Sequence, residues 1–244
     1  MGKKLLFLVF IFSAFEHSLC GQNKIKSYRF NTFTDIANPV ICIPTFGISI
    51  FMQANARKPS TIEIQNLIRK NINSFDRIAT YQWNPKIAKA SDIVAGASAL
   101  LPFALLLDKN MRRDGLKIAN VTFQSFLLSQ TLCNVAKLSL RKRPYVYNTN
   151  LSLETRMEGD NNLSFFSGHT TAVSSLCFST AFAYNTYHPN SNVKPYILVG
   201  AFTLPAIQGL LRVKAGKHYP TDVITGYLVG LGTSFLMHKL HVSK

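Results

Sequence analysis

The chain has 244 residues and a formal net charge of +16, with 47% hydrophobic and 16% charged residues. This apolar content excludes a disordered basic tail, and four cysteines are too few for a small disulfide scaffold. The length favours one large domain, which is either a helical domain or a domain unevenly embedded in a membrane. A strongly basic chain can also bind nucleic acid. Because the basic residues flank apolar blocks and form no recognised reading module, we expect no nucleic-acid partner.

The first 21 residues have the layout of a secretory signal peptide. Lys3 and Lys4 precede an apolar run over residues 5–15, and small residues follow. An uncleaved membrane anchor is the alternative. That run is shorter than the roughly 20 residues that cross a bilayer, and Glu16 interrupts it. We therefore expect residues 1–21 to be an export signal.

Beyond the signal, apolar blocks alternate with polar connectors and predict an all-α bundle. The blocks cover residues 39–54, 93–107, 118–136, 170–184, 196–211 and 223–237. Ser, Thr, Gln and Asn are scattered within them, which suits helices whose inner faces hydrogen-bond to one another. We expect five or six apolar helices in a membrane-embedded bundle, with essentially no sheet. A soluble exported bundle is the alternative, because most blocks are short for a bilayer.

The N-terminal part of the chain is the least regular. Pro39 and Pro44 interrupt the first block, so a re-entrant segment or a short helix competes there with a membrane span. Apolar residues at helical spacing predict an amphipathic helix within residues 62–75. The chain thus divides into the signal at 1–21, an N-terminal apolar segment with an amphipathic connector at 22–90, and a helical core at 91–244.

The charged connectors give a partial prediction of topology. Lys109, Arg112 and Arg113 follow the second block, and by the positive-inside tendency their connector lies in the cytoplasm. The connectors over residues 137–143 and 212–217 would then lie outside, although they are basic too. Their charge has another explanation, in three motifs that stand at the ends of the blocks.

The first motif runs from Lys137 to Arg143 and Pro144, at the end of the third block. Arginine presents a planar fork to phosphate oxygens, and lysine a compact charge. Taken alone, these residues are better explained as a basic belt at the membrane surface.

The second motif, Ser167-Gly168-His169, stands just before the fourth block. Ser167 is a good helix cap, Gly168 lets the backbone approach a ligand closely, and the unpaired N–H groups of a first turn attract an anion. His169 would then lie beside that anion as a proton donor. The alternative is a capped helix with an incidental histidine.

The third motif contains Arg212, His218, Pro220 and Asp222. Pro220 predicts a helix that begins just beyond His218. Residues four apart share a helix face, so Asp222 could orient the imidazole of His218 and fix its tautomer, as in covalent catalysis. Alone, such a pair is more often an ordinary helix start. The three motifs together supply cations, two histidines and a carboxylate at helix ends that can meet at one membrane face.

In this order, the three motifs resemble the signature of the type 2 phosphatidic acid phosphatase superfamily, which includes bacterial acid phosphatases and vanadium haloperoxidases. The resemblance implies a helical core and a reaction without metal or other cofactor. It makes His218 the nucleophile, Asp222 its orienting partner and His169 the acid that protonates the leaving oxygen. It also implies that the phosphate is bound by Arg143, Arg212, Ser167, Gly168 and Lys137.

Three positions depart from the family pattern. The family usually has six residues between its lysine and the Arg-Pro pair, whereas five separate Lys137 from Arg143. Phe166 replaces the usual proline before Ser-Gly-His, and Leu211 replaces the usual serine before the arginine of the third motif. None of these changes removes a reacting group, so we expect an active enzyme.

The expected function is hydrolysis of lipid phosphate monoesters or lipid pyrophosphates through a phosphohistidine, by a membrane protein whose site faces the non-cytoplasmic side. A headgroup could reach such a site without its lipid leaving the bilayer. The alternatives are a soluble exported acid phosphatase on small phosphate esters, a vanadate-dependent haloperoxidase, and a non-catalytic protein that binds lipid headgroups.

Overall fold

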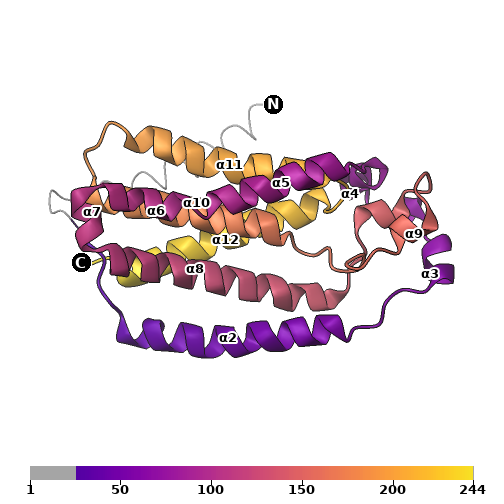
Figure 1. Cartoon of the computed structure of the whole chain (residues 1–244), viewed down its shortest axis with the longest axis horizontal. Coiled ribbons are helices and arrows are strands. Elements are labelled where there is room, and N and C mark those ends of the chain that lie inside the picture. Colours follow the sequence, from indigo (N-terminus) through magenta and orange to yellow (C-terminus); the bar gives the residue numbers. More distant parts are fainter. Residues whose placement is uncertain (1–25, 244) are drawn as a thin grey trace.

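Long helices lying side by side dominate the computed structural model, which describes residues 26–243 (Figure 1). The signal peptide expected at residues 1–21 lies outside the described residues. The bundle consists of α2 (Thr32–Ala54), α5 (Pro85–Ser98) continued by α6 (Leu101–Ala104), α8 (Gly115–Ala136), α10 (Gly168–Tyr187), α11 (Lys194–Lys214) and α12 (Pro220–His241). The described residues contain one isolated β-bridge, between Tyr28 and Val242, and no sheet. The all-α prediction is therefore confirmed.

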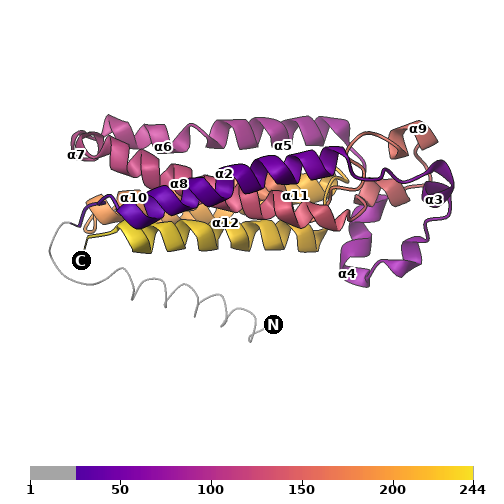
Figure 2. The ribbon, with the colours of Figure 1, turned by 90° about the horizontal axis from the view of Figure 1, so that it is seen from below.

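Short helices lie at the two ends of the bundle. One end carries a cap, formed by the connectors that follow α2 and α8, while α7 (Lys109–Arg113) and the C-terminus lie at the other end (Figures 1 and 2). The cap comprises α3 (Thr61–Gln65), η1 (Arg69–Asn71), α4 (Ser74–Arg77), η2 (Ile78–Tyr81), η5 (Pro144–Tyr147) and α9 (Leu153–Arg156). Two further 3-10 turns, η3 (Leu105–Leu107) and η4 (Lys137–Ser139), extend α6 and α8.

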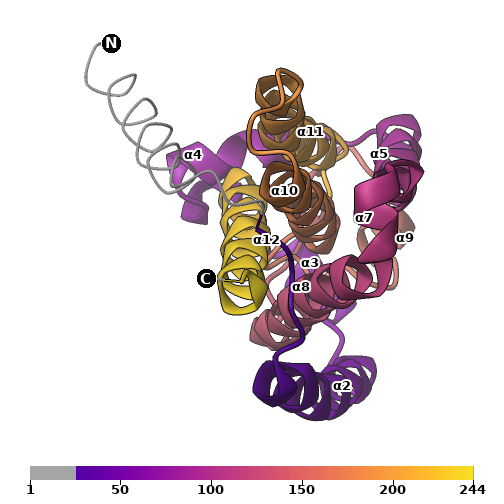
Figure 3. The ribbon, with the colours of Figure 1, turned by 90° about the vertical axis from the view of Figure 1, so that its left-hand side faces the viewer.

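The central helix is α10, which α5, α8, α11 and α12 surround (Figure 3). Its closest neighbour is α12, because Gly230 leaves room for the backbone of α10: a Cβ at Gly230 would lie 2.6 Å from the carbonyl oxygen of Thr171. Ser174 Oγ donates to the carbonyl of Tyr227 at 2.7 Å, and Ser234 Oγ to that of Ser175 at 2.9 Å. Polar side chains thus hydrogen-bond between helices, as expected from their scatter within the apolar blocks.

The outer faces of the bundle are apolar. Three helical segments among the described residues are long and apolar enough to cross a membrane, namely Thr32–Ala54, Pro85–Leu107 and Lys194–Lys214. On α2, Phe33 is 80% exposed and Phe51 70%. Exposed apolar surface of this extent is typical of contact with lipid and unsuited to water. The protein is a membrane protein, and these faces argue against the soluble alternative.

The first apolar block is part of one continuous helix. Helix α2 contains Pro39 and Pro44 without ending at either, so the re-entrant and short-helix alternatives for residues 39–54 are wrong. Each proline removes one backbone donor, a loss that membrane helices tolerate when neighbouring helices hold them in place. Gln53 Nε2 supplies such an anchor by donating to the carbonyl oxygen of Asn134, on α8, at 2.7 Å.

The amphipathic helix predicted within residues 62–75 does not form as one unit. The chain instead forms α3, η1 and α4, with a C-cap at Asn66 and an N-cap at Asn73. Asparagine side chains bond to nearby backbone groups outside helices, so they favour caps over helix interiors. Helix α5 begins at Pro85 and crosses residue 90, where the helical core was expected to begin. The division into domains stays a prediction.

Candidate active site

The three sequence motifs converge beneath the cap. Helices α8 and α11 end at this side of the bundle, and α10 and α12 begin there (Figures 1 and 2). The first motif follows α8, the second starts α10, and the third connects α11 to α12. The antiparallel order of the helices therefore brings the predicted cations and histidines to one place.

The imidazole of His218 is held in one orientation. Only 2% of this residue is exposed, and it lies in the loop just before α12. Its Nδ1 is 2.8 Å from the carbonyl oxygen of Ser164, and its Nε2 is 3.2 Å from Nη1 of Arg143. A carbonyl can only accept and a guanidinium can only donate, so Nδ1 carries the proton and Nε2 presents a lone pair. This is the tautomer that a nucleophilic Nε2 requires.

Arg143 is the buried cation nearest to that lone pair. Only 4% of Arg143 is exposed. Its guanidinium donates to the carbonyl oxygens of Asp160 and Lys217, both at 2.8 Å, and to the carboxylate of Asp160. These bonds fix the plane of the guanidinium beside His218. The bonds to Asp160, Lys217 and His218 use four of its five N–H groups, so its fixed positive charge and the remaining N–H of Nη2 are what it can offer to phosphate oxygens.

Asp222 contacts His218 less directly than predicted. Helix α12 begins at Pro220, so His218 precedes the helix and the two residues do not share a helix face. Asp222 Oδ2 lies 3.6 Å from His218 Nδ1, and it accepts hydrogen bonds from Ser164 Oγ at 2.6 Å and the backbone N–H of Tyr219 at 3.0 Å. Ser164 therefore connects the two, because its carbonyl binds the imidazole and its hydroxyl binds the carboxylate.

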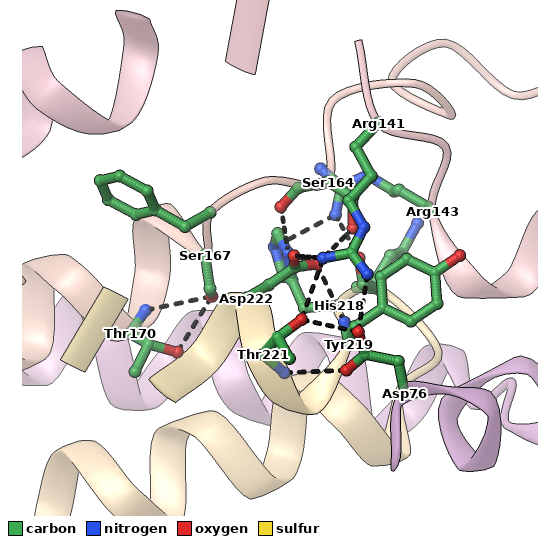
Figure 4. Close-up of polar contacts among 12 residues, drawn as sticks. Asp76, Arg141, Arg143, Ser164, Ser167, Thr170, His218, Tyr219, Thr221 and Asp222 are labelled. Carbon is green, nitrogen blue, oxygen red and sulfur yellow. Dashed lines mark hydrogen bonds and ion pairs between the residues drawn. The ribbon is translucent and has the colours of Figure 1, made fainter. Parts of the chain in front are cut away.

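Arg141 joins Asp222 to the cap (Figure 4). Its Nη1 donates to Asp222 at 2.6 Å, its Nη2 to Asp76 at 2.7 Å, and its guanidinium lies 4.1 Å from the ring centroid of Tyr219. Asp76, on α4, also accepts from the backbone N–H and the hydroxyl of Thr221 at 3.0 and 2.7 Å. The cap is thus bonded to the start of α12, directly beside His218.

Replacing Arg141 by alanine is expected to destabilise the fold strongly. Asp222 and Asp76 are 0% and 1% exposed, and the change would leave two buried carboxylates without their cation, which typically costs about 3–5 kcal/mol. Thermal unfolding in detergent measures the loss as a lower Tm. Arg57→Ala is the matched control, because its partner Glu63 is exposed and no measurable loss is expected. Equal Tm values for the two variants would contradict the structural role of Arg141.

The second motif forms the start of α10. Ser167 is the N-cap and its Oγ accepts from the backbone N–H of Thr170, so the predicted capping is confirmed. The N–H groups of Gly168 and His169 have no acceptor within the helix, as in any first turn. Lys137 reaches the same place despite its shifted spacing: its Nζ lies 3.6 Å from where a Cβ at Gly168 would stand. An ammonium group and two N–H groups can therefore bind one anion.

Arg212 and His169 share a partner that the sequence analysis did not identify. Asp92, on α5, lies 3.0 Å from His169 Nε2 and 3.1 Å from Arg212 Nη1 through the same oxygen, and Ser91 Oγ accepts from Arg212 at 2.9 Å. The Nε of Arg212 is buried and has no hydrogen-bond partner among the described residues. A buried donor without an acceptor is costly, so a bound phosphate oxygen would satisfy it.

His218 is surrounded by positive charge. Burial, followed by the charges of Arg143, Arg212, Lys137 and His169, lowers the pKa of His218 well below its ordinary value. His218 is therefore neutral, as a nucleophile must be.

This pKa predicts how stability depends on pH. Below the ordinary histidine pKa of about 6.5, the unfolded chain gains a proton at His218 that the folded protein does not bind, so stability falls as the pH falls. The Tm of the wild type should drop more between pH 7.5 and 5 than that of His218→Asn, which cannot titrate there. A drop of equal size in both proteins would show that His218 is not the group responsible.

Some site residues could have been found from the sequence and others could not. Asp92 is the one acidic residue of the segment Pro85–Leu107, which is apolar enough to cross a membrane, and ionisable groups at such positions usually have a function. Arg141 stands within the first motif. Asp76 and Ser164 carry no comparable signal, because only the folded chain brings them to Arg141 and His218.

A membrane-embedded helical bundle with buried cations around two histidines fits the phosphatase superfamily that the three motifs resemble. A family model of the PAP2 superfamily matches residues 116–244. The chain belongs to this superfamily and is a phosphatase, a phosphoric ester hydrolase.

The comparison with solved structures agrees on the fold. The chain is similar to the transmembrane PAP2-type phosphatidylglycerolphosphate phosphatase from Bacillus subtilis, with a TM-score of 0.50 and 19% sequence identity. The match covers 81% of this chain and 94% of the other. No curated protein matches the sequence.

Proposed function

We propose that this protein hydrolyses lipid phosphate monoesters or lipid pyrophosphates through a phosphohistidine on His218. The observation that carries the proposal is the imidazole of His218, whose Nδ1 is bonded to Ser164 and whose Nε2 faces Arg143 in a buried cationic pocket. Simple headgroup binding needs cations and amides alone, and it would not require a neutral histidine held in this tautomer. The non-catalytic alternative is therefore the weaker one.

In the proposed reaction, Nε2 of His218 attacks the phosphorus and the bond to the leaving oxygen breaks. His169 gives its proton to that oxygen, then accepts a proton from the water that attacks the phosphohistidine and releases inorganic phosphate. Arg143, Arg212 and Lys137, with the N–H groups at the start of α10, would neutralise the charge on the phosphoryl oxygens. Asp222 acts through Ser164 and holds His218 in place.

The position of the pocket supports a lipid substrate. The site lies at one end of helices whose outer faces are apolar, so a lipid headgroup could enter it while the acyl chains stay in the bilayer. At the opposite end Lys109, Arg112 and Arg113 are exposed, which favours the cytoplasm for that end and the non-cytoplasmic face for the site. Cysteines introduced in place of Arg112 and Lys58 should react with an impermeant reagent on opposite sides of the membrane.

A phosphate-release panel tests the function. The purified protein, in detergent with a metal chelator, is given lipid phosphates, lipid pyrophosphates and small water-soluble phosphate esters. Turnover of the lipids in the chelator supports the proposal. Turnover of the small esters alone would favour the acid phosphatase alternative, and halide oxidation that depends on vanadate would favour the haloperoxidase. No release from any compound would refute hydrolysis.

The contact between Asp92 and His169 predicts a dependence on the leaving group. Burial and the guanidinium of Arg212 lower the pKa of His169 to about 4, and the Asp92 carboxylate opposes this shift. Protonation of His169, which an alkyl alcohol needs in its leaving-group acid and a nitrophenolate does not, therefore depends on Asp92. Asp92→Asn should therefore slow the hydrolysis of alkyl phosphates by about 10²-fold, and that of nitrophenyl phosphate far less. Equal losses on both substrates would mean that Asp92 does not act through proton donation.

A further inference from the structure

An apolar cavity of about 360 Å³ lies between α6, α8 and α10, away from the charged pocket. Its walls are aromatic and aliphatic, with Phe103 and Leu106 on one side, Phe123 and Phe126 on α8, and Leu176 on α10. Phe103 and Phe123 are 66% and 52% exposed, so the cavity opens to the outer face of the bundle. In a membrane protein this face meets the hydrocarbon of the bilayer.

The cavity lies where a long apolar segment is broken. Helix α5 ends at Ser98, and α6 begins at Leu101 with Pro102 in its first turn. Both Ala99, in the break, and Pro102 line the cavity. Small and ring-constrained side chains at this point leave volume that a regular helix with larger residues would fill.

One face of α5 and of its continuation α6 leads from the active site to this cavity. Ala99 and Leu100, between the two helices, keep right-handed helical dihedral angles. Asp92, Gly96, Ala99 and Phe103, at spacings of four, three and four residues, therefore lie on roughly the same face. Asp92 contacts His169 in the active site, whereas Ala99 and Phe103 line the cavity. Between them, a Cβ added at Gly96 would meet nothing within 4 Å. Helix α5 packs on α10 and α11 and scarcely touches α8, so α8 does not cover this path.

The distance from Asp92 along α5 and α6 matches the length of a lipid chain. Ala99 and Leu106 stand seven and fourteen residues after Asp92, or about 10 and 20 Å at about 1.5 Å per residue. An acyl chain in one leaflet reaches about 15 Å, half of the roughly 30 Å hydrocarbon core. The far end is narrow, since Leu106 Cδ2 lies 3.1 Å from where a Cβ at Gly115 would stand.

We propose that this cavity binds the end of one acyl chain of the lipid whose phosphate occupies the active site. The inference rests on the proposed function and adds a specificity: the enzyme selects lipid phosphates whose chain is long enough to reach from Asp92 past Gly96 into the cavity. The continuity of one face of α5 and α6 with the site favours the chain of the substrate over that of an unrelated bilayer lipid. The closed end of the cavity, at Leu106 and Gly115, sets the maximum length of the preferred acyl chain.

Blocking the path tests this inference. Gly96→Leu would obstruct the path and Ala119→Phe would fill the cavity, and neither residue touches the charged pocket. Phosphate release is measured in detergent with dipalmitoyl and dihexanoyl phosphatidic acid. Each variant should lower kcat/KM for the long-chain lipid about tenfold, because about two methylenes of its chain would no longer be buried. The kcat/KM for the short-chain lipid should stay unchanged. Leu107→Phe, at a position that is 85% exposed and outside the cavity lining, is the matched control and should change the rate on neither lipid.

The short-chain substrate separates this inference from the function on which it rests. Normal short-chain turnover shows that a variant is folded and catalytically competent, so a selective long-chain loss supports the acyl-chain site. An unchanged ratio between the two substrates, whether both rates fall or neither does, overturns it and leaves the phosphatase function intact. Failure of the wild type to release phosphate from either lipid would refute the lipid phosphatase function itself, and this inference with it.

Discussion

His218→Ala is expected to reduce phosphate release by at least about 10³-fold, because the proposed phosphohistidine cannot form without this imidazole. The wild type, quenched in alkali during turnover of a phosphate-labelled lipid, should carry label on histidine, and the variant should not. The imidazole is buried and bonded on both nitrogens, so a substitute side chain cannot reproduce its position.

His188→Ala is the matched control for this variant. His188 lies at the opposite end of the bundle, where its Nε2 is 3.3 Å from Asp108, and its loss should leave turnover and labelling unchanged. Label that persists on the His218→Ala protein would move the nucleophile to another residue. Full turnover without label would rule out a covalent intermediate on His218.

Arg143→Lys is expected to lower kcat/KM by about 10²–10³-fold although the charge is kept. The guanidinium contacts His218 Nε2, the carbonyl of Lys217 and both the carbonyl and carboxylate of Asp160 at the same time. One ammonium group cannot make these bonds together, so both the orientation of His218 and the binding of phosphate oxygens should suffer.

Initial rates over a range of lipid phosphate concentrations measure this loss. Arg112→Lys, at an exposed position on α7, makes the same chemical change away from the site and should behave as the wild type. If Arg143→Lys also kept the wild-type kcat/KM, positive charge alone would be sufficient at this position, and the role assigned to the guanidinium fork would be wrong.

Prediction from the sequence succeeded where the signal is local. The apolar blocks predicted the long helices, Ser167 predicted the cap of α10, and the order of the three motifs predicted the family. It failed where neighbouring residues compete, as in residues 62–75, whose apolar spacing is helical but whose asparagines end and start short helices. It also overestimated the effect of Pro39 and Pro44 on α2, since contacts with α8 offset the lost backbone bonds.

The residues that would do the chemistry were readable from the sequence, but their partners were not. His218, His169, Arg143 and Arg212 belong to short motifs whose spacing is a property of the chain itself. The bonds of Arg141 to Asp76 and of His169 to Asp92 join positions far apart in the sequence.

Which carbonyl holds His218, and which carboxylate meets His169, depends on how helices pack. Hydrophobic periodicity and capping involve residues within a few positions of one another, so the sequence by itself determined the helices, the motifs and the reaction class. The tautomer of His218, the bonds between cap and α12, and the apolar path along α5 arise from contacts between distant segments, and only the tertiary structure decided them.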